Sequence, residues 1–343
     1  MKLFPLLAFL LLLCHSALAD SELYERARAL YYGDGVAQDY QQAFSVFEDA
    51  ADTGNLDAQT ALGIMYIEGR GVAQNDKKGI DLLAKSAEQN NARAQYYLGI
   101  MYYLGIGVKA DLSVAFKWIK QAAENSYQDA EQQLALMYEQ GRGTQKDKIL
   151  AEKWYKKSAK SGNPQAQFYI AKRYFDAKYY DKAYIWLLKS AKQNNPQAQF
   201  YLAELLNSGN GVKKDQKKAF KWYKKSVENG NNLGVYVLAN FFDKGISTKI
   251  DYKKSHQLYQ IAKKQGNLAA YLDIARHYFG AQGVKKDLQK AYNFTIAAAR
   301  KGYTPAQQKV VIMYKNGIGV KKSIRKAKYW LKRLAKNSNK NKS

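Results

Sequence analysis

The sequence predicts an all-α protein, a right-handed α/α superhelical solenoid of about nine helix-turn-helix repeats. Pairs of glycines separated by one residue recur at a spacing of 36 residues, at Gly69/Gly71, Gly105/Gly107 and Gly141/Gly143. Between them, apolar and small residues follow helical spacing, and no alternating strand pattern competes. A fixed period of about 20–50 residues indicates units that bury their apolar faces only by stacking on neighbours.

The first nineteen residues are expected to be a secretory signal peptide. Lys2 supplies a positive start, residues 3–13 form a short apolar run, and an A-x-A sequence precedes Asp20. The run is too short to cross a bilayer as a helix. The alternative, lipid attachment at Cys14, is disfavoured because Leu13 stands where that signal normally has a small residue. We therefore expect export through the secretory pathway, to the periplasm or beyond the cell.

Cysteine usage limits the chemistry of the mature chain. Cys14 is the only cysteine in the sequence and would leave with the signal peptide, so neither disulfides nor thiol chemistry are expected. No later run approaches the roughly 20 apolar residues of a membrane-spanning helix. The stability of the mature protein should therefore come from packing.

Charge is distributed unevenly along the chain. Residues 20–108 contain 13 acidic and 7 basic residues, a net charge of −6, whereas residues 109–343 contain 16 acidic and 47 basic residues, a net charge of +31. Such asymmetry is typical of a protein with an anionic partner, such as a membrane surface, a cell-wall polymer, nucleic acid or an acidic protein. The alternative is a lysine-biased genome, since lysines outnumber arginines 45 to 10.

The repeat can be placed along almost the whole mature chain. The predicted boundaries lie near 20–55, 56–91, 92–127, 128–163, 164–195, 196–231, 232–267, 268–303 and 304–337. The polar residues 338–343 are expected to form a disordered tail.

Each repeat is predicted to contain two amphipathic helices. In the third repeat the first helix has Ala94, Leu98 and Tyr102 on one face, and the second has Ala115 and Trp118. The five tryptophans share this second position, where other repeats have Phe294 or Leu258, so we expect core residues rather than a stacking platform for sugars or bases. They are Trp118, Trp154, Trp186, Trp222 and Trp330.

The turn inside each repeat is predicted to end the first helix with left-handed glycines and to start the second with a capping side chain. The expected caps are Asn75, Asp111, Asp147, Asp215, Asp251 and Asp287. A nucleotide-binding loop is excluded because no strand precedes the glycines. Repeat five lacks the glycine turn and is four residues shorter, which should change the local curvature. Ser247 replaces the second glycine in repeat seven, and Ala281 the first in repeat eight.

The segment "AQYYLGIMYYLGIGVKADLSVAFKWIKQAA", residues 94–123, resembles the Sel-1-like repeat (SLR) family of tetratricopeptide-like solenoids. The matching motif consists of alanine, leucine-glycine, tyrosine, G-x-G-V, aspartate, alanine and tryptophan. The resemblance implies a secreted bacterial adaptor or scaffold that binds other proteins, of a kind often linked to envelope function, host-cell entry or virulence. A branch of the family with paired cysteines in each repeat is associated with penicillin binding or β-lactam hydrolysis, and this chain lacks those cysteines.

Candidate catalytic groups are few. Asp251, Ser255 and His256 lie close in sequence, but Ser255 occupies a position that other repeats fill with alanine, so a triad is not expected. His277 stands where other repeats have Met65 or Met101, which favours packing. No histidine lies in a metal-ligand spacing. We expect no enzyme, no cofactor, no metal and no small-molecule substrate.

Candidate binding residues follow from the stack. The first helix of each repeat should face a concave surface, with inward positions two before, two after and five after the core leucine. These positions vary between repeats and contain aromatic residues, the usual anchors of interfaces. The alternative is that the aromatics fill contacts between adjacent repeats. The candidates are Tyr96, Ile100, Tyr103, Phe168, Lys172, Phe175, Phe200, Glu204, Tyr236, Asn240, Arg276 and Phe279.

Three functional hypotheses remain. The first is an exported scaffold for protein–protein contacts at the bacterial envelope or host interface, acting as a monomer. The second is attachment of the basic C-terminal repeats to an anionic polymer, membrane or nucleic acid, with a strong dependence on salt. The third and least favoured is an enzyme that acts on cell wall or β-lactams.

Overall fold

The computed structural model describes the backbone of residues 21–340 and the side chains of residues 21–335. The described residues form eighteen helices and no strand, the first helix spanning residues 21–32. The predicted signal peptide lies outside the described residues. The remaining helices are α2 (Tyr40–Asp52), α3 (Leu56–Glu68), α4 (Asp76–Glu88), α5 (Ala92–Leu104), α6 (Leu112–Glu124), α7 (Gln128–Gln140), α8 (Lys148–Ser161), α9 (Pro164–Asp176), α10 (Tyr180–Lys192), α11 (Pro196–Ser208), α12 (Gln216–Glu228), α13 (Gly234–Lys244), α14 (Tyr252–Lys264), α15 (Leu268–Gly280), α16 (Leu288–Arg300), α17 (Thr304–Asn316) and α18 (Ile324–Lys340).

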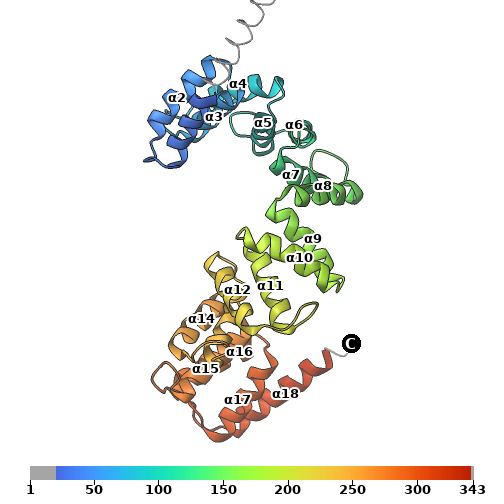
Figure 1. The fold of residues 1–343 in the computed structure, drawn as a ribbon. Helices are drawn as coiled ribbons and strands as arrows, with labels where there is room; N and C mark the ends of the chain where they lie inside the picture. Colours follow the sequence, from blue (N-terminus) through green and yellow to red (C-terminus); the bar gives the residue numbers. More distant parts are fainter. Residues whose placement is uncertain (1–20, 341–343) are drawn as a thin grey trace, which may run out of the picture. The chain divides into compact units, whose positions relative to one another are not determined.

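These helices form nine antiparallel pairs that follow one another along the chain (Figure 1). Successive helices pack on one another within each unit; α5, for example, packs against α6 of its own pair, and α6 packs against α7 of the next pair. The helices are grouped in two compact units, one ending at Gln167 and one beginning at Phe168, both within α9. The predicted all-α repeat fold with nine helix pairs is therefore confirmed.

The two glycines of each turn have different roles. Gly105 ends α5 in the left-handed conformation, with φ of 73°, and its N–H donates to the carbonyl of Met101 at 2.8 Å. Gly143, the second glycine of its turn, lies over the start of the preceding repeat's α6, where a Cβ would stand 1.9 Å from the Leu112 carbonyl oxygen. The prediction that both glycines end the first helix is therefore incomplete. The second glycine lets successive repeats approach each other closely.

The predicted caps are confirmed. Asp111, for example, precedes α6, and its carboxylate accepts the backbone N–H of Val114 at 3.0 Å. The other expected caps, Asn75, Asp147, Asp215, Asp251 and Asp287, precede their helices in the same way.

The irregular turns keep the same backbone form without glycine. Ser247 and Ala281 have φ of 57° and 56°, so both adopt the left-handed conformation that side chains disfavour. In repeat five the linker between α9 and α10 shrinks to residues 177–179, with Lys178 at φ of 63°.

The prediction that the tryptophans belong to the core is correct for Trp330, and Trp118, Trp186 and Trp222 pack against the buried core clusters. Trp330 is buried, whereas the other four are half-buried. Their exposed faces are covered in part by lysine side chains, such as Lys157 Nζ at 4.9 Å from the Trp154 ring centre and Lys225 Nζ at 5.1 Å from that of Trp222. A long basic side chain can cover an apolar ring and keep its charge in water, and the spacing of apolar residues does not indicate this.

A row of glutamines joins successive repeats. In repeat three, the buried Gln95 donates from Nε2 to the carbonyl of Ala87 in repeat two at 3.2 Å. Four further glutamines make the same bond to the alanine eight residues earlier: Gln59, Gln167, Gln199 and Gln307. Repeat four has Glu131 at this position, and the ammonium group of Lys157 donates to the Ala123 carbonyl instead, at 3.1 Å.

The chain end differs from the prediction in one respect. α18 continues to Lys340, so three of the six residues expected in a disordered tail, 338–340, are helical. The polar residues after 337 include no proline or glycine that would end a helix. Among the described residues, no helix combines the length and apolar character that crossing a bilayer requires.

Candidate functional site

Eleven of the twelve predicted binding residues are half-buried, and Phe279 is 51% exposed. Three lie on α5 in the first unit, Tyr96, Ile100 and Tyr103. The others belong to the second unit: Phe168, Lys172 and Phe175 on α9, Phe200 and Glu204 on α11, Tyr236 and Asn240 on α13, and Arg276 and Phe279 on α15.

Many of these side chains hold helices of the stack together. The ring of Tyr96 lies 5.1 Å from that of Tyr127, which directly precedes α7, the first helix of the next repeat. The hydroxyl group of Tyr236 donates to Asp273 of the next repeat at 2.9 Å. Glu204 accepts a hydrogen bond from Tyr223, and Asn240 accepts one from Tyr259 at 3.0 Å.

Further candidates make similar contacts. Phe175 packs on Tyr201 of the next repeat with ring centres 5.0 Å apart. Tyr103 accepts a hydrogen bond from Arg142 of the next repeat. Lys172 pairs with Asp176 on its own helix. These contacts agree with the alternative interpretation, in which many of the aromatics fill space between repeats.

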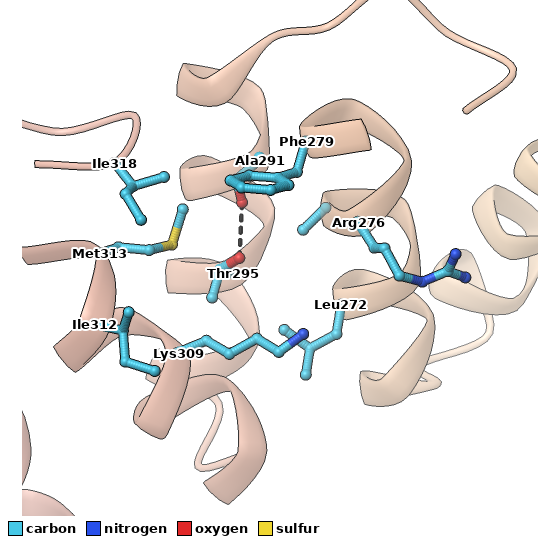
Figure 2. Close-up of a pocket in the computed structure, with 10 residues that line it drawn as sticks. Leu272, Arg276, Phe279, Ala291, Thr295, Lys309, Ile312, Met313 and Ile318 are labelled. Atoms are coloured by element: carbon cyan, nitrogen blue, oxygen red, sulfur yellow. Dashed lines mark hydrogen bonds between the residues drawn. The ribbon is translucent and has the colours of Figure 1, made fainter. Parts of the chain in front are cut away.

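Arg276 and Phe279 differ because they line a pocket. It has a volume of about 230 Å³ and lies between α15, α16, α17 and the turn after α17 (Figure 2). Its wall is apolar, and two of its apolar side chains, Phe279 and Ile312, are 51% and 52% exposed. The lining residues are Leu272, Ala275, Arg276, Phe279, Ala291, Thr295, Lys309, Ile312, Met313 and Ile318.

The pocket exists because of Thr295. The equivalent position in repeats one to seven is filled by a large side chain that is 3% exposed or less. Those residues are Phe47, Leu83, Ile119, Tyr155, Leu187, Tyr223 and Tyr259. Thr295 is smaller, and its hydroxyl group turns back to donate to the Ala291 carbonyl at 2.7 Å (Figure 2). The space between repeats eight and nine is therefore left partly open.

The two cationic side chains at the pocket behave differently. Arg276 lines the wall with its methylene groups, and its guanidinium group points away (Figure 2) to donate to Asp243 at 2.7 Å and to Asp273 at 3.3 Å. Lys309 extends along the opening toward Leu272, and its side chain is exposed. Lys309 is therefore the cation that a bound molecule would meet.

Behind Arg276 lies a partly buried chain of hydrogen bonds. Asp243 accepts from Nε2 of His277 at 2.7 Å, and Nδ1 of His277 lies 3.3 Å from Nδ1 of His256. Because the carboxylate only accepts, His277 carries its proton on Nε2, and its Nδ1 accepts from His256. Nε2 of His256 in turn accepts from the side-chain amide of Gln260 at 3.2 Å. This arrangement satisfies each ring nitrogen while both histidines are neutral.

Burial favours the neutral form of both histidines. It lowers the pKa of His277, although the carboxylate of Asp243 opposes the shift. Burial, with smaller contributions from His277 and Lys263, lowers the pKa of His256 to about 4. The prediction that His277 packs in the core is correct, since its side chain is fully buried, but its bond to Asp243 was missed.

The arrangement offers no catalytic triad at the sequence candidate. Ser255 is buried and donates to the Tyr252 carbonyl at 3.1 Å, and Asp251 caps α14. Among the side chains of residues 21–335, no three acidic, histidine or cysteine groups are placed to hold a metal ion.

Eight of the ten pocket residues were absent from the sequence prediction: Leu272, Ala275, Ala291, Thr295, Lys309, Ile312, Met313 and Ile318. The signal that identifies them is a single substitution. Aligned on the tryptophan position, Thr295 is the one small polar residue among large apolar or aromatic ones.

Comparison with known proteins places these observations in a family context. The model of the Sel1 repeat matches nine segments, 23–55, 56–91, 92–127, 128–163, 164–195, 196–231, 232–267, 268–303 and 306–339. No curated protein sequence matches the chain significantly.

Two solved structures are similar over most of the chain. A protective antigen of uropathogenic Escherichia coli strains with an SLR fold is 29% identical, with a TM-score of 0.63, over 92% of this chain and 76% of that one. A Sel1 repeat protein from Oxalobacter formigenes is 32% identical, with a TM-score of 0.51, over 84% of this chain and 85% of that one.

Proposed function

Because this chain belongs to the Sel1 repeat family, we propose that it is an exported scaffold that binds a protein partner at the envelope or host interface. Sel1 repeat proteins generally mediate protein–protein interactions. In this proposal, the pocket between repeats eight and nine receives one apolar side chain of the partner. Export rests on the signal-like residues 1–19.

The pocket's size and wall support a protein partner. Sites for drug-sized molecules usually measure about 300–1,000 Å³. A volume of about 230 Å³ is smaller, yet it exceeds the roughly 150 Å³ cavity that holds a benzene molecule. One aromatic or branched aliphatic side chain therefore fits. Interfaces concentrate their binding energy in such anchors, which enter dry pockets surrounded by weaker contacts.

The observation on which the proposal depends is the exposure of Phe279 and Ile312 beside a pocket that Thr295 leaves open. Neither side chain is covered by another repeat. Both lie on odd-numbered helices, which are the first helices of their repeats. Exposed apolar side chains at a hollow are typical of a binding surface.

Capture of partners from envelope and host extracts tests the proposal. Residues 20–343 are used as bait, alone and with Thr295→Leu, which fills the pocket, or with Phe279→Ser. The control is Ile261→Ser, because Ile261 is 45% exposed on the even-numbered helix α14. We expect the first two variants to lose a partner that the control retains. Equal capture by all three variants would remove the pocket from the proposal.

The basic C-terminal half favours a second candidate function, attachment to an anionic polymer or membrane. The net charge of +31 over residues 109–343 is the supporting observation. Attachment of this kind should weaken steeply between about 50 and 200 mM salt. Capture through the pocket should change little over the same range, so the two functions can be separated in one experiment.

We also propose a more specific role in virulence, which rests on the similarity to the protective antigen of uropathogenic E. coli. We do not propose an enzyme, because Sel1 repeat scaffolds are typically non-enzymatic interaction modules.

A further inference from the structure

The last described repeat leaves its stacking face uncovered. Leu331 on α18 occupies the position that Ile119 occupies on α6, and in repeats one to eight the residue there is at most 3% exposed. Leu331 is 45% exposed. The residues near it on the same face of α18 are exposed too: Ile324 (50%), Lys328 and Ala335.

The preceding repeats explain the difference. Ile119 is covered because α7, the first helix of the next repeat, packs against α6. Within residues 21–340 no helix follows α18. The inner face of α18 is satisfied, since Ala327 and Trp330 are buried in the core of repeat nine. The uncovered face of α18 is therefore equivalent to the face of α6 on which α7 packs.

We propose that this face binds an α-helix of another protein, which takes the place of the first helix of a tenth repeat. α18 is the last labelled helix and lies beside α17 (Figure 1), so a helix bound to this face would continue the stack. The partner helix must satisfy the same contacts as α7, where Ala130 and Leu134 are fully buried. It therefore presents a small residue and, four positions later, a leucine on one face.

Charge defines the partner further. The described side chains of α18 include five basic residues and no acidic one. The basic residues are Arg325, Lys326, Lys328, Lys332 and Arg333. An acidic amphipathic helix is complementary to this surface.

The same charge disfavours a second copy of the chain as the occupant. Two α18 helices face to face would place like charges together. Head-to-tail stacking is opposed at the other end, because Arg26 stands exposed in repeat one where the core leucine of repeat two, Leu62, is 4% exposed.

The protein supplies a probe for this site. The segment 127–140 contains α7, with Asp129 and Glu139 and no basic residue. We would synthesise it with Glu131→Gln, the residue that most repeats have there, and lock it as a helix by a bridge on its far face. A fluorescent label then reports binding to residues 20–343 by anisotropy.

The expected result is saturable binding that Leu331→Lys weakens by at least about tenfold, the usual effect of one buried leucine. Tyr329→Ser is the matched control, because Tyr329 is 59% exposed on the same helix but faces away from the stack, and it should leave binding unchanged. Circular dichroism confirms that both variants fold.

Three outcomes would overturn the proposal. They are the absence of binding, equal binding by the Leu331→Lys variant, and binding that a scrambled peptide matches. A parallel arm uses vesicles containing phosphatidylglycerol. If Leu331→Lys reduces vesicle binding and the peptide does not bind, the face belongs to a membrane surface and the helix partner is wrong. The capture experiment on the pocket is independent, since no pocket residue lies on α18.

Discussion

Two of the junctions that depart from the common pattern do so in opposite ways. Between repeats three and four the core position is filled by Ile119, but the usual glutamine is replaced by Glu131. Between repeats eight and nine the glutamine is kept, and Gln307 donates to the Ala299 carbonyl at 3.1 Å, but the core position holds only Thr295.

The consequences differ because the first change is compensated and the second is not. Nζ of Lys157 lies 3.0 Å from Glu131 and donates to the Ala123 carbonyl that a glutamine would otherwise reach. No neighbouring side chain fills the space beside Thr295, and a pocket of about 230 Å³ remains. A compensated substitution indicates a structural role, whereas an uncompensated cavity with exposed apolar edges indicates a binding surface.

The largest expected effect is at the compensated junction. Lys157→Ala should lower the free energy of unfolding by about 3 kcal/mol, because it leaves the fully buried carboxylate of Glu131 without a counter-ion. Urea unfolding followed by circular dichroism measures the change. The double variant with Glu131→Gln should recover most of the loss, and failure to recover it would contradict the pairing.

The second-largest effect is expected when the threonine of the junction between repeats eight and nine is placed at the junction between repeats three and four. Ile119→Thr should destabilise the protein by about 2 kcal/mol, because it removes buried methyl groups and leaves a cavity. Urea unfolding measures the loss. Ile149→Thr is the control, since Ile149 is 83% exposed, and it should be nearly neutral. A loss at Ile119 no larger than at Ile149 would show that this position does not seal the junction.

Filling the pocket between repeats eight and nine should stabilise the protein. Thr295→Leu should raise the free energy of unfolding by about 1 kcal/mol, as cavity filling commonly does. The thermal midpoint should rise with it. A destabilised Thr295→Leu variant would mean that the pocket is too rigid to accept the side chain that other repeats hold.

The smallest expected effect is a loss of folding stability at acidic pH. The pKa of His256 is lowered to about 4 and that of His277 is also lowered, so both bind protons more readily in the unfolded chain. Stability is complete above the unfolded pKa near 6.5 and should fall as the pH drops toward 4. At pH 5.5 the loss from His256 should be below about 1 kcal/mol, since solvent screens this half-exposed side chain.

The variant with His256→Phe and His277→Met copies the residues of repeat three, Phe116 and Met101. It should unfold with less dependence on pH between 6.5 and 5. An unchanged pH dependence would mean that the two histidines do not cause the loss of stability at acidic pH.

The sequence was sufficient for the fold because its features repeat. The glycine turns, the capping aspartates such as Asp111 and the small-residue pattern occur in most repeats. A feature that recurs in this way does not arise by chance, so it identifies the fold. The pocket arises from one departure, Thr295, and a departure has meaning only when the position's neighbours are known. The partners of Glu131 and Asp243 were missed because they lie on neighbouring helices whose contacts depend on side-chain direction.

The central claim is that the opening beside Thr295 accepts an apolar side chain. The most direct measurement is a methyl NMR titration of residues 20–343 with N-acetyl-L-phenylalanine amide, observing Ile312 and Met313. We expect saturable shifts of both methyl signals in the wild-type protein and none in the Thr295→Leu variant. Shifts of equal size in both proteins, or none in the wild type, would contradict it.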